Sequence, residues 1–183
     1  MKYALIFILL ISPFSINAQT LNKRHIKEVI VDFRSMSRAA MDGDIESVKI
    51  FLNRHVPPNG ISLMDSAELE KYSDTDEIDD HFLYYTDTYV RPIQAAAENG
   101  HLEIVKLLLK SGANPNWCCC ECVTALHMAI ANKHEEVANL LIENGANINL
   151  PYQNAKGESF ANCLVFAKHQ GLKSTANLIK SKK

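Results

Sequence analysis

Length and charge already narrow the class of protein. The chain has 183 residues, of which 47% are hydrophobic, and its formal net charge is −2. A chain of this length suits a single domain with one continuous core. The charge is too close to zero to indicate a nucleic-acid partner, because proteins that bind nucleic acids present a strongly basic surface.

The N-terminus has the pattern of a secretory signal peptide. Lys2 precedes an apolar run from Tyr3 to Ile11, Pro13 interrupts it, and the small residue Ala18 marks a cleavage point. The run is shorter than the roughly 20 apolar residues that a membrane span requires, so no stable insertion is expected after cleavage. We therefore expect residues 1–18 to be removed and residues 19–183 to be periplasmic or secreted.

The middle of the chain repeats itself with a period of 33 residues, because residues 91–117 align with residues 124–150 almost position for position. The first copy contains RPIQAA, then IVKLLL, then GANPN; the second contains TALHMA, then VANLLI, then GANIN. Repetition at this period is typical of solenoids. The motifs resemble the ankyrin family, whose consensus combines T-P-L-H-x-A, an apolar second helix and G-A-D-x-N.

Two weaker copies flank this pair. The first has His55 where the motif has glycine, and the last stops at Lys183 before its Gly-Ala-Asn turn. In the middle copies the apolar residues recur at helical spacing, and Gly112 and Gly145 follow the second helices, as helix-ending glycines do. We predict an all-α ankyrin-repeat solenoid of about four helix-turn-helix repeats at residues 34–59, 91–117, 124–150 and 161–183.

In the ankyrin family, hairpin loops called fingers join the repeats, and two fingers of this chain are unusually long. The segment between Asn59 and Arg91 exceeds the ordinary family length by 24 residues, and the segment between Asn149 and Asn162 by five. The long insertion, residues 60–90, contains nine acidic residues against one lysine, whereas the last repeat is rich in lysine. Insertions in solenoids often form the binding face.

The insertion also carries aromatic residues, which favour protein contacts because they offer large areas with polar tips. The alternative is that these side chains cover the solenoid and that the acids are merely solvated. We predict a partner-binding surface that includes Phe82, Tyr84, Tyr85, Tyr89, Trp117, Tyr152, Asp79 and Asp80.

A cysteine cluster occupies the middle finger. In an exported protein the four thiols of Cys118, Cys119, Cys120 and Cys122 are expected to oxidise to disulfides. With Cys163 the count is five, so one thiol stays free or pairs with a second chain, which makes a homodimer conceivable. A bridge between Cys122 and Cys163 is one guess at the connectivity.

No motif of a catalytic site is present, so we expect no enzyme. The cysteine turn has the spacing of a soft-metal or redox site, but no second ligand pair accompanies it, and His127 matches the structural histidine of T-P-L-H. We expect no cofactor and no metal.

The resemblance implies a scaffold that binds another protein through the concave face formed by its fingers and first helices, here called the inner face. One candidate role is an immunity or inhibitor protein that neutralises a toxin. The alternatives are a metal-binding or redox-buffering protein that uses the cysteine cluster, and a secreted effector that binds a host protein.

Overall fold

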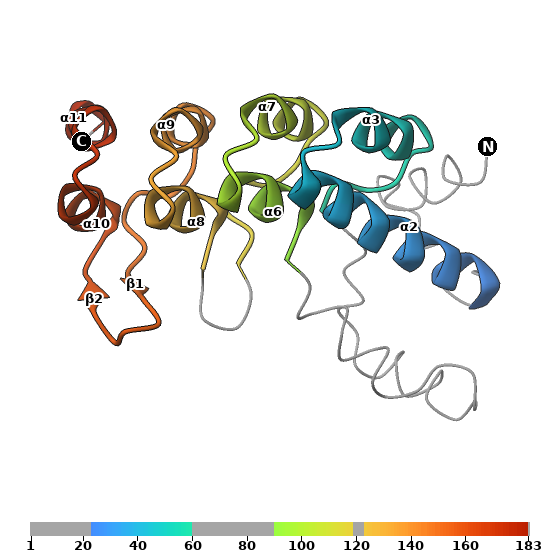
Figure 1. Cartoon of the computed structure of the whole chain (residues 1–183), viewed down its shortest axis with the longest axis horizontal. Coiled ribbons are helices and arrows are strands. Elements are labelled where there is room, and N and C mark those ends of the chain that lie inside the picture. Colours follow the sequence, from blue (N-terminus) through green and yellow to red (C-terminus); the bar gives the residue numbers. More distant parts are fainter. Residues whose placement is uncertain (1–22, 60–89, 119–122, 183) are drawn as a thin grey trace, which may run out of the picture.

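The computed structural model describes residues 23–59, 90–118 and 123–182, with the side chains of residues 23–30 left out. Within these ranges the chain forms four helix pairs and one short hairpin (Figure 1). The pairs are α2 (Lys23–Asp42) with α3 (Ile45–Asn53), α6 (Pro92–Glu98) with α7 (Leu102–Lys110), α8 (Ala125–Ala131) with α9 (Glu135–Glu143), and α10 (Cys163–Gln170) with α11 (Lys173–Ser181). The hairpin strands are β1 (Tyr152–Gln153) and β2 (Ser159–Phe160).

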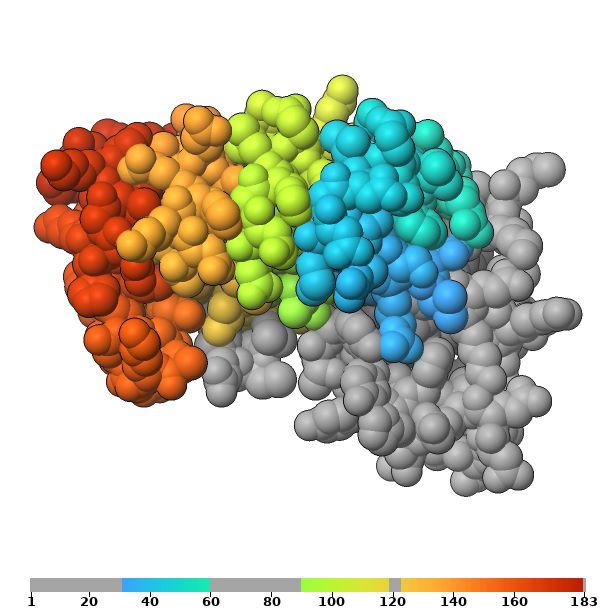
Figure 2. Space-filling view, viewed as in Figure 1, coloured from blue at the N-terminus to red at the C-terminus, as the bar shows by residue number. Residues whose placement is uncertain are grey.

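The helix pairs stack side by side into two layers. The first helices α2, α6, α8 and α10 pack in succession, and the second helices α3, α7, α9 and α11 form a parallel row beside them (Figure 1). In the space-filling view the pairs form successive bands from one end of the molecule to the other (Figure 2). The predicted all-α solenoid is confirmed, and its core lies between the layers and between neighbouring pairs.

The apolar stripes predicted from the sequence form this core. In α7 the residues Ile104, Val105 and Leu108 are buried, and in α9 the residues Val137 and Leu141 are buried. No single pair could cover its own stripe, so the stability of each repeat depends on the neighbour that covers it.

The second helices α3, α7 and α9 are each followed by a residue in the left-handed conformation. Gly112 and Gly145 have φ values of +88° and +85°, and His55 takes the same place after α3 with a φ of +61°. His55 therefore stands where the motif has glycine, as the sequence predicted. A side chain in this conformation is strained, since its Cβ crowds the following carbonyl.

The first helix starts earlier than predicted. The sequence analysis placed the first repeat from about residue 34, whereas α2 begins at Lys23 and runs to Asp42. The side chain of Asp32 binds Arg54 beyond the end of α3, with 2.9 Å between the carboxylate oxygen and the guanidinium nitrogen. Phe33 is buried, and Val31 next to it is 52% exposed. Asp32 and Phe33, which precede the predicted start of the first repeat, thus belong to the first helix pair.

Asparagine side chains connect successive turns. The Asn59 amide donates to Gly112 O at 2.9 Å, and its oxygen accepts from Asn114 N at 2.7 Å. One repeat later, the Asn116 amide donates to Gly145 O at 2.9 Å and its oxygen accepts from Asn147 N at 2.6 Å. We call these four bonds the asparagine ladder. They satisfy backbone groups in the loops that follow α7 and α9.

The last finger is a small antiparallel hairpin. Tyr152 faces Phe160 across its two strands, and Gly157 turns the chain with a φ of +81°. In Figure 1 this hairpin projects from the layer of first helices, on the side opposite the second helices. Among the helices of the described residues, none combines the length and the apolar composition needed to cross a membrane.

Candidate protein-binding surface

Long polar side chains in the first helices bind the backbone that enters the next helix pair. Gln94 accepts from Arg91 N at 3.0 Å and donates to Val123 O at 2.8 Å. His127, one repeat later, accepts from Thr124 N at Nδ1 (3.2 Å), and its Nε2 lies 3.4 Å from Leu150 O. Because Thr124 N–H is a donor, Nδ1 carries no proton and Nε2–H donates to Leu150 O. His127 is fully buried, which agrees with the structural role predicted for it.

Trp117 packs over a buried cation at the base of the middle finger. The guanidinium carbon of Arg91 lies 4.0 Å from the centroid of the Trp117 ring and 5.2 Å from that of Phe33. Arg91 is only 5% exposed, whereas Trp117 is half-buried. A cation held against aromatic faces stabilises a structure by about 0.5 to 2 kcal/mol. Trp117 thus has a packing role, and its part in partner binding stays a prediction.

Tyr152 belongs to an aromatic cluster that holds the last finger. Its ring stacks on His127 with 5.1 Å between centroids and lies 4.5 Å from Phe166. Phe160 packs against Phe166 at 4.6 Å and against His169 at 4.9 Å. Tyr152 itself is half-buried. The cluster fixes the ring of Tyr152, and the part of this residue in partner binding stays a prediction.

Glu98 acts electrostatically on this phenol. The pKa of Tyr152 is raised above its ordinary value, chiefly because burial disfavours the phenolate and secondly because the negative charge of Glu98 opposes it. Glu98 is the last residue of α6 and is exposed.

The ends of the first helices form a row across the inner face. The repeat alignment places Met41, Glu98, Ala131 and His169 at equivalent positions, and each is partly or fully exposed. Sequence reasoning did not single out Glu98, although an acid next to an alanine-rich helix end was visible.

Cys163 is a free, fully buried thiol at the first position of α10. Its sulfur lies 3.9 Å from Asn147 O and 4.0 Å from Leu150 O, and burial raises its pKa to about 12. The guessed bridge between Cys122 and Cys163 is therefore wrong for this structure, because the thiol faces the core. Cys118 is half-buried, while Cys119, Cys120 and Cys122 lie outside the described residues.

Several other predicted contacts also lie outside the described residues. They are Phe82, Tyr84, Tyr85, Tyr89, Asp79 and Asp80, together with the proposed signal peptide at residues 1–18. Within the described ranges, no three His, Cys, Asp or Glu side chains are grouped so that they could hold a metal ion.

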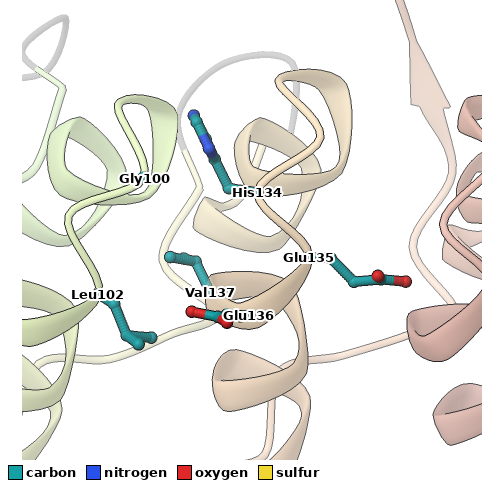
Figure 3. Close-up of a pocket in the computed structure, with 6 residues that line it drawn as sticks. All are labelled: Gly100, Leu102, His134, Glu135, Glu136 and Val137. Carbon is teal, nitrogen blue, oxygen red and sulfur yellow. The ribbon is translucent and has the colours of Figure 1, made fainter.

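A shallow depression of about 200 Å³ lies on another part of the molecule, between the turn after α6 and the start of α9. Figure 3 shows the six residues that line it, which are Gly100, Leu102, His134, Glu135, Glu136 and Val137. His134 contacts Glu98 O, and Glu135 accepts from backbone amides of α11. Because these two side chains already have protein partners, the depression offers little to a ligand.

Comparison with solved structures adds a functional context. The chain is similar to a chain in the complex of the predatory endopeptidase Bd0816 from Bdellovibrio bacteriovorus with immunity protein Bd3460, with 28% sequence identity and a TM-score of 0.56. The match covers 81% of this chain and 63% of that chain, so this chain spans less than two thirds of the matched one. No curated protein sequence matches significantly.

The family itself follows from the repeats. The family model for ankyrin repeats matches residues 36–152 with three copies, from within α2 through α9 to the start of the last finger. The geometry of the helix pairs, the glycine turns and the buried His127 agrees with that match. The chain therefore belongs to the ankyrin-repeat family.

Proposed function

We propose that this protein is a non-catalytic binding module that neutralises or inhibits a partner protein, as an immunity protein does. The observation that carries the proposal is the similarity to a chain of the complex between an endopeptidase and its immunity protein. Ankyrin repeats are protein-interaction modules, which makes a protein partner the appropriate class. The fold alone would not identify the role, so the proposal also draws on the elaborated fingers.

We place the contact on the inner face and the fingers. Trp117 and Tyr152 are both half-buried and stand at the base of a finger. The insertion at residues 60–90 adds nine acids and the aromatic residues Phe82, Tyr84, Tyr85 and Tyr89. Such a composition suits a basic partner surface, for which complementary charge mainly accelerates association.

Export is part of the proposal. The pattern of Lys2, the apolar run and Ala18 supports a signal peptide, so we place the mature chain, residues 19–183, in the periplasm or outside the cell. A protein in this compartment meets toxins delivered from other cells before they reach their targets.

The test is affinity capture by the mature chain from its native envelope fraction, followed by mass spectrometry. The wild type is compared with a variant that lacks residues 62–87. We expect a basic partner that is captured by the wild type and lost or strongly weakened with the deletion, and whose activity the wild type inhibits. Equal affinity of the deletion variant for the purified partner would exclude the insertion from the interface.

The same preparation tests the alternative role of the cysteine cluster. Copper and zinc are measured in protein purified from the periplasm, in the wild type and in a variant with serine at Cys118, Cys119, Cys120 and Cys122. We expect no stoichiometric metal. Metal that is lost with the cysteines, together with no captured partner, would replace the binding role with metal buffering.

A further inference from the structure

The last helix pair exposes positions that the three earlier pairs bury. In α10, Val165 is 46% exposed and Leu164 is half-buried. In the earlier pairs the equivalent residues are at most 6% exposed; they are Ser37, Gln94 and His127 at the position of Val165, and Met36, Ile93 and Leu126 at the position of Leu164. Two apolar side chains of α10 are therefore open where every other first helix is covered.

This exposure follows from the place of α10 in the stack. Helix α6 packs on α2, α8 on α6 and α10 on α8, and in Figure 1 the pair of α10 and α11 forms one end of the described stack. Among the described residues, α10 therefore lacks the following first helix that covers its equivalents. Leu164 and Val165 precede Lys168 by four and three residues, so the three share one side of α10. We call these three residues the end face.

The end face is basic. Lys168 is exposed and stands where the earlier pairs have fully buried small or apolar residues, namely Ala40, Ala97 and Ile130. Residues 151–182 carry five lysines and a single acid, Glu158, whose carboxylate accepts from Asn154. Among the described residues, none of the five lysines forms an ion pair. The positive charge of the last pair is thus uncompensated within the part of the chain that the structure describes.

Solubility explains only part of this arrangement. The terminal repeats of solenoids need a polar outer face, and Lys168 contributes to one. Such a face can carry both signs of charge and needs no apolar residue. The end face instead combines Leu164 and Val165 with a lysine, in a pair whose charges are almost all positive. Apolar side chains framed by charge of one sign are typical of a docking surface.

We propose that the end face binds an acidic amphipathic helix of a partner protein. The helix lies along α10 as α10 lies along α8, with apolar side chains on Leu164 and Val165 and a carboxylate at Lys168. Burial of apolar surface supplies affinity, and the opposite charges favour this partner over a basic one. The contact lies beyond the inner face, so it adds to the proposed function and does not depend on it.

A second copy of this chain is a poorer occupant. The helix at the other end of the stack is α2, which contains five lysine and arginine residues against three acids. Arg34 and Arg38 are exposed on it. Like charges would therefore meet if the end face of one copy stacked on α2 of the next, and such contacts oppose association.

The experiment uses the mature full chain and follows the NMR signals of the Leu164 and Val165 methyl groups. The probe is a capped helical peptide of about 15 residues, with leucine and alanine on one side and glutamate on the other. The same peptide with lysine in place of glutamate is the control. We expect saturable shifts with the acidic peptide only. Shifts with both peptides, or with neither, would overturn the proposal.

Substitutions then test the two parts of the end face. Lys168→Glu should weaken the acidic peptide about tenfold, because it opposes carboxylate with carboxylate. Val165→Gln should weaken it about fivefold, because it removes apolar contact area. Both residues are exposed, so the ring signals of the buried Phe166 should stay unchanged and show that the fold is intact.

The matched control is Lys110→Glu. Lys110 is also an exposed lysine in the last turn of a helix, but it belongs to α7. It changes the net charge by the same amount as Lys168→Glu and should leave the affinity for the acidic peptide unchanged. Equal weakening by both variants would reduce the effect to general electrostatics and overturn the end face as a site.

Two further measurements separate the other occupants. Sedimentation of the protein alone would reveal self-association, and a dimer that Val165→Gln abolishes would assign the end face to a second copy. Vesicles with anionic lipid would bind in place of the peptide if the face met a membrane. Either result, without binding of the acidic peptide, would overturn the proposal. A partner captured through the inner face would still support the proposed function, so the two can fail separately.

Discussion

His134 lies directly over Gly100 of the preceding repeat, with its Nε2 atom 3.0 Å from Glu98 O (Figure 3). A Cβ atom on Gly100 would come within 2.5 Å of Nδ1 of that ring. His101 stands over Gly43 in the same way, with 2.7 Å between its Cε1 atom and the position of an added Cβ. The glycine in the turn of one repeat thus makes room for the histidine of the next.

The third turn supports this explanation. It has Lys133 in place of glycine, with a φ of +61°, and the next repeat has Leu172 in place of the histidine. A side chain is therefore present in the turn where no imidazole ring follows. Backbone conformation alone does not decide the residue at this position; the neighbouring repeat contributes to the choice.

We predict that Gly100→Ala destabilises the protein more than Gly112→Ala. Both glycines have a positive φ, which costs an alanine about 1 to 2 kcal/mol. An added Cβ at Gly112 meets nothing within 4 Å, whereas one at Gly100 meets His134. Overpacking of this kind costs about 1 to 3 kcal/mol more. Urea denaturation of the two variants measures the difference in the free energy of unfolding.

The double variant Gly100→Ala with His134→Ala separates steric conflict from backbone strain. If the ring causes the excess cost, the two substitutions together should destabilise by less than the sum of their separate effects. Additive effects, or equal costs for Gly100→Ala and Gly112→Ala, would mean that His134 does not impose the glycine.

His127→Leu is predicted to destabilise the protein by about 2 to 5 kcal/mol, because it leaves Thr124 N–H and Leu150 C=O without their partner in a buried place. His127→Gln should cost less, since Gln94 makes the equivalent pair of bonds one repeat earlier. Thermal and chemical denaturation compare the variants. If glutamine were as damaging as leucine, ring stacking on Tyr152 would outweigh the hydrogen bonds.

Glu135→Ala is predicted to loosen the last helix pair. Glu135 Oε1 accepts from Ser174 N at 2.8 Å and Thr175 N at 3.2 Å, at the start of α11. The N-cap of α11 is Leu172, whose side chain cannot accept a hydrogen bond, so Glu135 replaces the missing cap from the neighbouring repeat. Loss of a cap costs about 0.5 to 2 kcal/mol.

Hydrogen exchange of the α11 amides measures this loss, and Glu136→Ala is the control. Both glutamates occupy the first turn of α9, so both substitutions remove the same favourable interaction with the helix dipole. Exchange in α11 should accelerate with Glu135→Ala only. Equal acceleration in both variants would assign the effect to α9 itself.

The Cys163 thiol is predicted to be unreactive in the folded protein. Its pKa of about 12 leaves very little thiolate at pH 8, and its burial excludes reagents. In a background with serine at Cys118, Cys119, Cys120 and Cys122, thiol reagents should label Cys163 only after unfolding. Rapid labelling of the folded protein, or a peptide that links Cys122 to Cys163 in the wild type, would contradict this.

The same thiol predicts how stability depends on pH. Its pKa rises from an ordinary 9.0 in the unfolded chain to about 12 in the folded protein, so the unfolded state loses its proton first. Folding stability from this group is full below pH 9 and is lost as the pH rises towards 12. The difference in unfolding free energy between wild type and Cys163→Ala should shrink over that interval. A constant difference would place the thiol in water.

The sequence predicted the repeats because their signals are local. Each repeat carries short motifs that predict the glycines after the second helices and the buried role of His127. The recurrence of these motifs gives the 33-residue period. The start of α2 at Lys23 was missed because residues 23–33 carry no repeat motif. The burial of Cys163 was also missed, although the repeat alignment pairs it with Ala125, which is fully buried as well.

The candidate site depends on contacts that no local motif encodes. Arg91 meets Phe33 of the preceding helix pair and Trp117 at the other end of its own repeat, and Tyr152 stacks on His127 of the preceding repeat. These relationships require the stacking geometry, which sets how far each finger reaches. The sequence could identify Tyr152 and Trp117 as aromatic candidates, but not the histidine or the cation on which they pack.

The asparagine ladder has a consequence for the order in which the molecule comes apart. Asn59 and Asn116 join the first three helix pairs with the same chemistry, whereas the fourth pair is joined to the third by Glu135 and Asn139, which bind Ser174 and Thr175. In a one-dimensional array, each junction has its own free energy. The last pair, together with the hairpin that carries Tyr152, can therefore open while the first three pairs stay folded.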